Sequence, residues 1–269
     1  MSRLDRGVTT TVVVLGVAFG LFFIVPFAGL IDRALRVPNT WDLLRASQVR
    51  KALVLSLWTS GVTVGLTLLL GTPVAYLLAR RRFPGHAVID ALIDLPIVLP
   101  PTVAGVALLT AFGRRGLLGE PIEEWTGFTF GFRTTAVIMA QLLVAAPFYI
   151  RSAKSGFDSL DVQVERVAYT LGASRTRTFF RITVPQAAPA LIAGTVLCWA
   201  RSMGELGATL IFAGNFEGRT QTMPLAIVSA FEGSSLGVAG AIALSLILLA
   251  TALTVLILFR VATDRGAAR

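Results

Sequence analysis

Charged side chains are scarce in this chain. They make up only 14% of the 269 residues, whereas 55% of the residues are hydrophobic. A soluble globular domain usually carries about 25% charged residues, so this composition argues against a soluble enzyme. The net charge of +9 comes almost entirely from arginine. We interpret this excess first as a signal of membrane topology rather than of nucleic-acid binding, because cytoplasmic loops of membrane proteins are enriched in Lys and Arg.

The residue types that carry most enzyme chemistry are equally rare. Cys198 is the single cysteine and His86 the single histidine, which excludes an intrachain disulfide and a Cys/His zinc site. The pair also gives little support for the nucleophile and base of a membrane-embedded hydrolase. Neither Lys51 nor Lys154 follows a glycine, so the sequence has no Walker-type phosphate loop. We predict no catalytic residues, no metal site and no bound cofactor, and we expect any ATP to be bound by a partner subunit.

Long apolar runs are abundant instead. A membrane-spanning helix needs about 20 mainly apolar residues. We interpret the first run as a retained span, because it is too long for the apolar core of a signal peptide. The sequence therefore predicts an all-α, polytopic membrane protein of one domain, residues 1–269, embedded in a lipid bilayer. Its six expected spans are residues 8–31, 52–79, 91–113, 134–151, 187–214 and 236–260.

The distribution of basic residues predicts the orientation. With the N-terminus inside, 14 of the 24 Lys and Arg residues fall in inner segments and nine in outer segments, while Arg201 falls within a span. The bias favours both termini in the cytoplasm. The outer segment 114–133 combines three glutamates with four aromatic residues. It is either an aromatic belt at the membrane interface or a docking surface for an external partner.

Prolines cluster at the start of the third span. Pro96, Pro100 and Pro101 lie within eight residues of one another. Each proline inside a helix removes a backbone donor and clashes with the preceding turn. Freed backbone groups at membrane depth are tolerated only inside protein or beside a watery cavity. The cluster indicates either a kinked or unwound helix near a pathway, or an ordinary kink satisfied by neighbouring helices.

Two oppositely charged residues lie in the fifth span. Arg201 and Glu205 are four residues apart, on one face of a helix. A charge at the bilayer centre costs at least about 2.5–3.5 kcal/mol, so such residues usually face the protein interior or a cavity. Either the two form an internal ion pair that fixes helix packing, or Arg201 lies beside the route of a transported anion and Glu205 neutralises it between transport events.

Two acidic residues lie at the start of the third span. Asp90 and Asp94 share a helical face near the expected inner interface. They either pair with Arg80, Arg81 or Arg82, or form a proton relay of an ion-coupled carrier.

The inner segment of about residues 152–186 is patterned as structure rather than as a linker. Its apolar residues recur at spacings of three and four, which predicts a short amphipathic helix. Asp161 is placed to cap this helix and Gly172 to end it. Ser174 is placed to cap a second helix, and we expect Pro185 to interrupt the backbone before the fifth span.

This segment resembles the "EAA" loop of permease subunits of ATP-binding-cassette importers. The matching features are Val167-Ala168, Gly172, and Ile182-Thr183-Val184-Pro185 at the family's spacing. The chain departs from the pattern at Arg166, where the family has glutamate, and at Val167 and Val184. The resemblance implies a coupling helix that fits a groove on the ATPase subunit. Its implied coupling residues are Glu165, Arg166, Val167, Ala168, Leu171, Gly172, Ala173, Ile182 and Pro185.

Further motifs resemble the molybdate and sulfate branch of these permeases. They lie at residues 95–105, 112–116, 201–209, 213–215 and 218–222, and the Gly-Glu-Leu-Gly-Ala-Thr form of residues 204–209 is closer to molybdate permeases. The proline cluster, the charges of the fifth span and the residues beside them predict a translocation pathway or gate at Pro96, Pro100, Pro101, Arg201, Gly204, Glu205, Gly207 and Thr209.

The resemblance also implies an assembly. The expected fold is that of a type I importer permease, working as a homodimer in the cytoplasmic membrane with its path between spans three and five of each copy. Two ATP-binding cassette subunits and an extracytoplasmic oxyanion-binding protein are the expected partners. The expected substrate is molybdate, possibly tungstate. A sulfate or thiosulfate permease is the alternative, and an ion-coupled secondary transporter is a further one.

Overall fold

The computed structural model describes residues 3–36, 43 and 45–267, and every regular element in this part of the chain is helical. The long helices are α1 (Arg3–Arg36), α3 (Ser47–Arg80), α7 (Thr134–Asp158), α10 (Val184–Met203) and α13 (Gly237–Ala267). The shorter ones are α4 (His86–Val98), α5 (Pro101–Phe112), α6 (Gly119–Thr126), α8 (Val162–Thr170), α9 (Arg175–Thr178), the π-helix η1 (Phe179–Thr183), α11 (Gly207–Ala213) and α12 (Met223–Phe231). The predicted all-α class is confirmed.

The number of spans agrees with the prediction, although two spans differ in shape. Five helices are long and apolar enough to cross a membrane, and the pair α4 and α5 makes a sixth candidate that is bent by 119°. The predicted fifth span, 187–214, is wrong at its end. The helix stops at Met203, and α11 is a separate element after a break.

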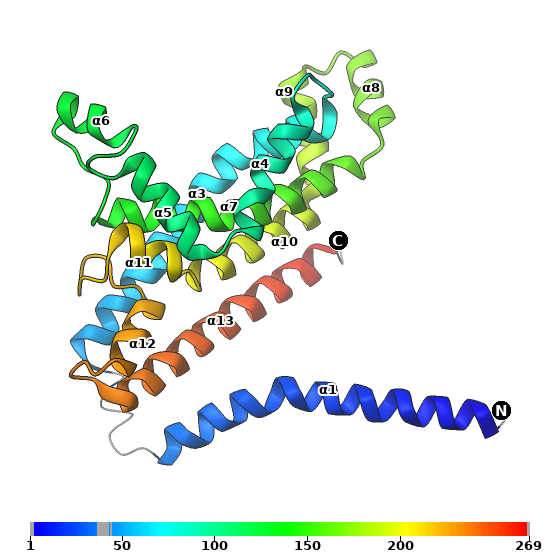
Figure 1. The fold of residues 1–269 in the computed structure, drawn as a ribbon. Helices are drawn as coiled ribbons and strands as arrows, with labels where there is room; N and C mark the ends of the chain where they lie inside the picture. Colours follow the sequence, from blue (N-terminus) through cyan, green and yellow to red (C-terminus); the bar gives the residue numbers. More distant parts are fainter. Residues whose placement is uncertain (1–2, 37–42, 44, 268–269) are drawn as a thin grey trace.

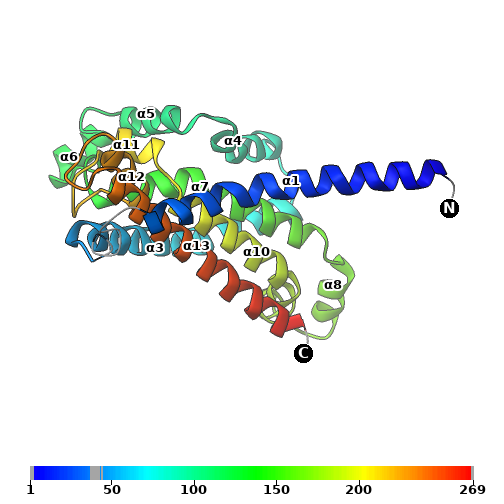
Figure 2. The ribbon, with the colours of Figure 1, turned by 90° about the horizontal axis from the view of Figure 1, so that it is seen from below.

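The centre of the molecule is α7, which lies between α3 and α10 (Figures 1 and 2). Small residues allow this close packing: a Cβ added at Gly156 of α7 would lie 2.5 Å from the Cβ of Ala190 on α10. Close contacts of small residues are typical of helix pairs in membranes, where apolar side chains gain little from leaving lipid.

A polar stripe fixes α3 against its neighbours. Its buried members Ser56, Thr59, Ser60, Thr63 and Thr67 recur along one face of α3. The Thr63 hydroxyl donates to Gln141 Oε1 on α7 at 3.0 Å, and the Gln141 amide donates to Thr59 Oγ1 at 3.2 Å. Ser56 Oγ accepts from the backbone N–H of Met223 at 2.8 Å. Hydrogen bonds of this kind hold the helices in one register.

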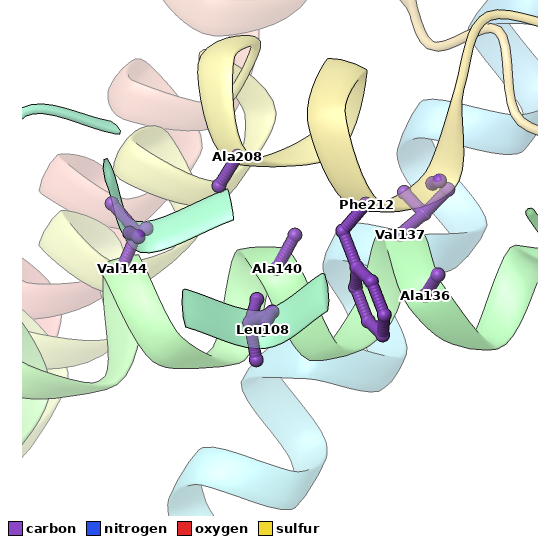
Figure 3. Packing of buried hydrophobic residues seen from close by; sticks show 9 residues of the cluster. Leu108, Ala136, Val137, Ala140, Val144, Ala208 and Phe212 are labelled. Carbon is purple, nitrogen blue, oxygen red and sulfur yellow. The ribbon is translucent and has the colours of Figure 1, made fainter. Parts of the chain in front are cut away.

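A second core joins the two elements that follow the breaks. Leu108 of α5 and Ala208 and Phe212 of α11 pack on a row of small and branched residues of α7 (Figure 3). That row consists of Ala136, Val137, Ala140 and Val144. α5, α11 and the first half of α7 therefore form one packed unit.

The two ends of the molecule differ in construction. α8 and α9 lie at one end, and α1 begins and α13 ends toward the same end (Figures 1 and 2). α6 and the loops around α12 lie at the opposite end. α1 packs against α13, and most of its described side chains are exposed, as in a helix that faces lipid.

Candidate functional site

The α8 helix has both of the predicted terminal signals. Asp161 Oδ1 accepts a hydrogen bond from the backbone N–H of Gln163 at 2.8 Å, which caps the first turn. Gly172 has φ +81°, its N–H bonds to Tyr169 O, and the N–H of Ala173 bonds to Ala168 O. These two bonds form a Schellman motif, which only a residue that tolerates the left-handed region closes without strain. The predicted cap and stop are confirmed.

Glu165 fastens α8 to the body of the chain. Its side chain is buried, and Oε1 accepts hydrogen bonds from Arg80 Nη2 at the end of α3 and from the hydroxyl of Thr183, both at 3.0 Å. Arg80 also donates to Leu160 O, just before α8. One carboxylate thus connects α3, α8 and η1. Glu165 is one of the predicted coupling residues, and its side chain lies inside the loop rather than on its surface.

The other face of α8 presents apolar side chains to the outside. Val164, Val167 and Leu171 are 38%, 56% and 81% exposed, and their spacing puts them on one side of the helix. Arg166, Gly172 and Pro185 are exposed too, Ala173 and Ile182 are half-buried, and Ala168 is buried. The predicted coupling residues therefore divide into an exposed set and a supporting set.

The chain after α8 is more regular than expected. Ser174 Oγ caps the next helix by accepting from the Arg177 N–H at 3.3 Å, as predicted. The predicted interruption at Pro185 is wrong, because residues Arg175–Met203 form one continuous helix. Pro185 lies in the first turn of α10, where proline is tolerated. The π-helix η1 precedes it, and the N–H of Val184 bonds to Phe179 O across the wider turn.

The third span is unwound at the prolines. α4 ends at Val98, Leu99 and Pro100 are extended, and Pro101 begins α5. The prediction of a broken helix is thereby confirmed, whereas Pro96 remains within α4. The axis of α5 is bent by 119° from that of α4, so α5 turns back instead of continuing in the direction of α4.

The break after α10 lies against the break before α5. A Cβ at Gly207 would lie 2.9 Å from Pro101 Cβ, and one at Gly105 would lie 2.8 Å from Ile211 Cβ. Glycine is needed at both positions because α5 and α11 approach so closely. The structure therefore brings the predicted pathway residues Pro101 and Gly207 together.

Arg201 and Glu205 form the expected ion pair, with Arg201 Nη1 2.9 Å from Glu205 Oε2. Glu205 lies beyond the end of α10 rather than inside a span, and its Oε1 accepts from the N–H of Ala208 at the start of α11 at 2.8 Å. Glu205 is 1% exposed and Arg201's side chain 27% exposed. The pair thus bridges the break.

The remaining pathway candidates are unequally accessible. Gly204, Pro100 and Pro101 are exposed and Pro96 is half-buried, whereas Gly207 and Thr209 are buried. Within the described residues the Thr209 hydroxyl has no hydrogen-bond partner. Glu205, Gly207 and Thr209 therefore line no open path in this conformation.

The predicted partners of Asp90 and Asp94 are wrong. Both carboxylates face α7. The guanidinium of Arg151 donates hydrogen bonds to the Asp94 carboxylate and to the Asp90 carboxylate, and Lys154 Nζ lies 3.1 Å from Asp90 Oδ1. Arg80 is unavailable because it is turned toward Glu165. Arg151 and Lys154, the actual partners, are not among the predicted ones. The sequence feature that indicates this pairing is the spacing of three residues between Arg151 and Lys154, which puts both basic side chains on one face near the end of α7.

Some aromatic residues of the predicted outer segment, 114–133, pack against one another. Phe130 makes edge-to-face contacts with Phe112 and Phe128, with centroids 6.0 and 5.1 Å apart. Trp125 is 89% exposed. The packed phenylalanines build the loop, and Trp125 is left at its surface.

Six candidate spans, one of them broken, and a capped helix mounted at one end of the bundle are the architecture of a polytopic membrane protein. The chain belongs to the family described as "Binding-protein-dependent transport system inner membrane component", whose profile matches residues 71–265. It is a membrane subunit of a transport system.

Several named relatives are similar over most of the chain. The molybdenum transport system permease protein ModB of Escherichia coli K12 is 41% identical over 77% of this chain and 90% of the relative. ModB of Mycobacterium tuberculosis is 42% identical over 74% of this chain and 75% of the relative. The molybdate/tungstate transport system permease protein WtpB of Pyrococcus abyssi is 42% identical over 61% of each.

Solved structures support the fold. A chain of a bacterial alginate ABC transporter, in complex with a periplasmic protein, superimposes with a TM-score of 0.75 at 16% identity, covering 98% of this chain and 96% of that one. A chain of the MetNI methionine ABC transporter gives a TM-score of 0.57 at 17% identity, over 86% and 97%. The predicted importer permease fold is confirmed.

Proposed function

We propose that this chain is the permease subunit of an ATP-driven importer that carries molybdate, or tungstate, across the cytoplasmic membrane. The observation that carries the importer function is the α8 helix, which is locked from behind by Glu165 and presents Val167 and Leu171 outward. The oxyanion is supported by the relatives named for molybdenum and for molybdate/tungstate.

The chain works as a homodimer with two ATP-binding cassette subunits and an external oxyanion-binding protein. α8 fits a groove on the ATPase subunit, so the end of the bundle that carries α8 and both described chain ends is cytoplasmic. ATP binding closes the ATPase pair, draws the two α8 helices together and opens the path outward. Hydrolysis restores the inward-facing state. ATP and all covalent chemistry belong to the partner subunit, and this chain binds no cofactor.

The substrate is tested by uptake of radiolabelled molybdate into proteoliposomes that contain the assembled complex and its binding protein. We expect ATP-dependent uptake that excess tungstate inhibits and excess sulfate does not. Equal inhibition by sulfate would favour a sulfate-type permease. Uptake that needs a proton gradient instead of ATP would favour the ion-coupled carrier.

The docking role of α8 has a matched control within the chain. Leu171 on the α8 side and Leu117 beside α6 are each 81% exposed, so Leu171→Asp and Leu117→Asp make the same chemical change at opposite ends. We expect Leu171→Asp alone to abolish association of the ATPase subunit in a pull-down. Retained association in Leu171→Asp, or equal loss in both variants, would contradict the docking role.

A further inference from the structure

A cavity of about 720 Å³ lies between the segments that follow α6 and α11, and Figure 1 shows α6 and α11 toward the end of the molecule opposite α8. Its walls are the segment that follows α6, residues 127–133, and the segment that follows α11, residues 216–219. Charged residues line it from both sides: Arg114, Glu123, Arg133, Glu217 and Arg219.

The two walls are fastened to each other. The hydroxyl of Thr134 donates to Arg219 O at 2.9 Å, and the N–H of Phe132 donates to Phe212 O at 3.2 Å. The rings of Phe132 and Phe216 make an edge-to-face contact with centroids 6.3 Å apart. The cavity is therefore a built feature that joins α7 and α11.

The backbone around the cavity is held in uncommon conformations. Phe132 has φ +57°, the one positive value at a non-glycine residue in the described part of the chain, and Gly127 and Gly214 have φ +68° and +72°. Backbone strain at a non-glycine residue is found most often at sites where function requires a particular shape. Both Phe132 and Gly127 line the cavity, so its wall is held in a defined and strained shape.

The charges leave two arginines uncompensated. Glu123 is paired with Arg114 at 2.9 Å, and Glu217 accepts from Gln48 at 2.6 Å and from Lys51 at 3.2 Å. The hydrogen bonds from Gln48, and to a smaller extent from Lys51, lower the pKa of Glu217. This carboxylate is therefore ionised at neutral pH, and its oxygens are already occupied by Gln48 and Lys51. Among the described residues no carboxylate pairs with Arg133 or Arg219.

Arg133 is also held in place from one side. Its guanidinium carbon lies 5.0 Å from the centroid of the Phe128 ring. An arginine stacked on an aromatic ring keeps its N–H donors in the plane of the guanidinium, where they are available to an anion. A tetrahedral oxyanion offers several acceptor oxygens to two such donor groups.

We infer that this cavity is an entry site for a tetrahedral oxyanion, held by Arg133 and Arg219 before it enters the path. The inference rests on the proposed function, which makes this end external. The site receives the dianion as the binding protein releases it. The Arg114–Glu123 pair and Glu217 with Lys51 limit the net positive charge, so that the anion is held briefly and passed on.

The test is equilibrium binding of radiolabelled molybdate to the complex of permease and ATPase subunits in nanodiscs, without the binding protein. We expect Arg133→Gln/Arg219→Gln to weaken binding about 100-fold, roughly tenfold for each charge-assisted contact. The control Arg50→Gln/Arg115→Gln removes two exposed arginines that do not line this cavity, and we expect it to change binding less than about twofold at matched ionic strength. The single variant Arg133→Lys keeps the positive charge but not the planar guanidinium with its paired N–H donors, and we expect molybdate binding to weaken by an intermediate factor of about tenfold.

Three results would overturn the inference. They are no molybdate binding by the wild-type complex, equal losses in the two double variants, and weaker docking of the oxyanion-free binding protein with unchanged molybdate binding. The last result would make the cavity a protein-docking surface. Uptake by wild-type proteoliposomes from the same preparation separates the two proposals. Uptake with no arginine-dependent binding refutes the entry site alone, whereas no uptake of molybdate or tungstate refutes the proposed function.

Discussion

Replacing Glu165 by alanine tests whether one buried carboxylate holds the α8 segment in place. The Arg80 and Glu165 side chains are 10% and 9% exposed, and removing one partner of a buried ion pair usually costs about 3–5 kcal/mol. We expect a smaller cost here, about 2–3 kcal/mol, because Arg80 keeps its bond to Leu160 O and lies near the end of α3. The hydroxyl of Thr183 also loses its acceptor.

The consequence is local opening of α8. A loss of about 2–3 kcal/mol corresponds to roughly 30- to 150-fold, at 1.4 kcal/mol for each factor of ten. Hydrogen exchange of the Ala168 and Tyr169 amides in the purified complex measures this opening, and exchange in α13 is the internal reference. We also expect the ATPase activity to lose its stimulation by the loaded binding protein, because a loosened α8 transmits less of the ATPase movement.

Two companion variants separate the charge from the side-chain volume. Thr183→Val removes one neutral donor and should cost only about 1 kcal/mol. In the double variant Arg80→Met/Glu165→Met, no unpaired charge remains, so the cost should be clearly smaller than the sum of the two single substitutions. Unchanged exchange in α8 of Glu165→Ala, or additive losses in the double variant, would refute this reasoning.

Three further substitutions have defined expectations. The Cβ of Gly172→Ala would meet no neighbouring atom, but the alanine must adopt φ +81°, so this substitution should destabilise α8 by about 1 kcal/mol. The control Gly65→Ala, in the middle of α3, should stabilise that helix by a similar amount. Equal effects of the two substitutions on hydrogen exchange in α8 would show that the Schellman motif is unimportant. Gly207→Ala places a Cβ 2.9 Å from α5, so we expect a loss of about 1–3 kcal/mol and reduced uptake, and a wild-type melting temperature would contradict the close packing. Arg151→Gln should lower the free energy of unfolding by only about 1 kcal/mol, because the side chains of Arg151, Asp90 and Asp94 are 25–44% exposed. Arg81→Gln is the control, and equal melting temperatures of the two variants would exclude a stabilising role for the Arg151 ion pairs.

Local signals in the sequence predicted local structure well. Asp161, Gly172 and Ser174 act on backbone groups within five residues of themselves, so their effects are contained in the sequence pattern. The break at Pro100 and Pro101 is predictable for the same reason, because proline removes a donor from its own helix. The six apolar runs likewise define the spans by composition alone.

Features that depend on neighbouring helices were not predictable in this way. Arg201, Gly204 and Glu205 interrupt the apolar run 187–214, but the position at which the helix ends, Met203, depends on how α11 packs against α5. The partners of Asp90 depend on how α4 is rotated against α7, and Arg151 is 61 residues away in sequence. The continuous helix through Pro185 depends on the wider turn of η1. The inward direction of Glu165 depends on Arg80, which comes from another helix.

The positions of the two breaks explain how motion at α8 is directed to the candidate path. Helices α8 to α10 are joined through η1 and the Glu165 contacts, so displacement of α8 moves α10 with it. Helix α10 ends at Met203. The break that follows is crossed by the Arg201–Glu205 pair, by the hydrogen bond from the Glu205 N–H to Ser202 O, and by the Glu205 carboxylate that accepts from the Ala208 N–H of α11. Because α11 is packed with α5 on α7, we expect α10 to turn about residues 204–206 while α5, α11 and the first half of α7 move as one unit. Pro101, the exposed first residue of α5, contacts Gly207 at that same junction, so we expect bending to be concentrated where the predicted pathway residues meet.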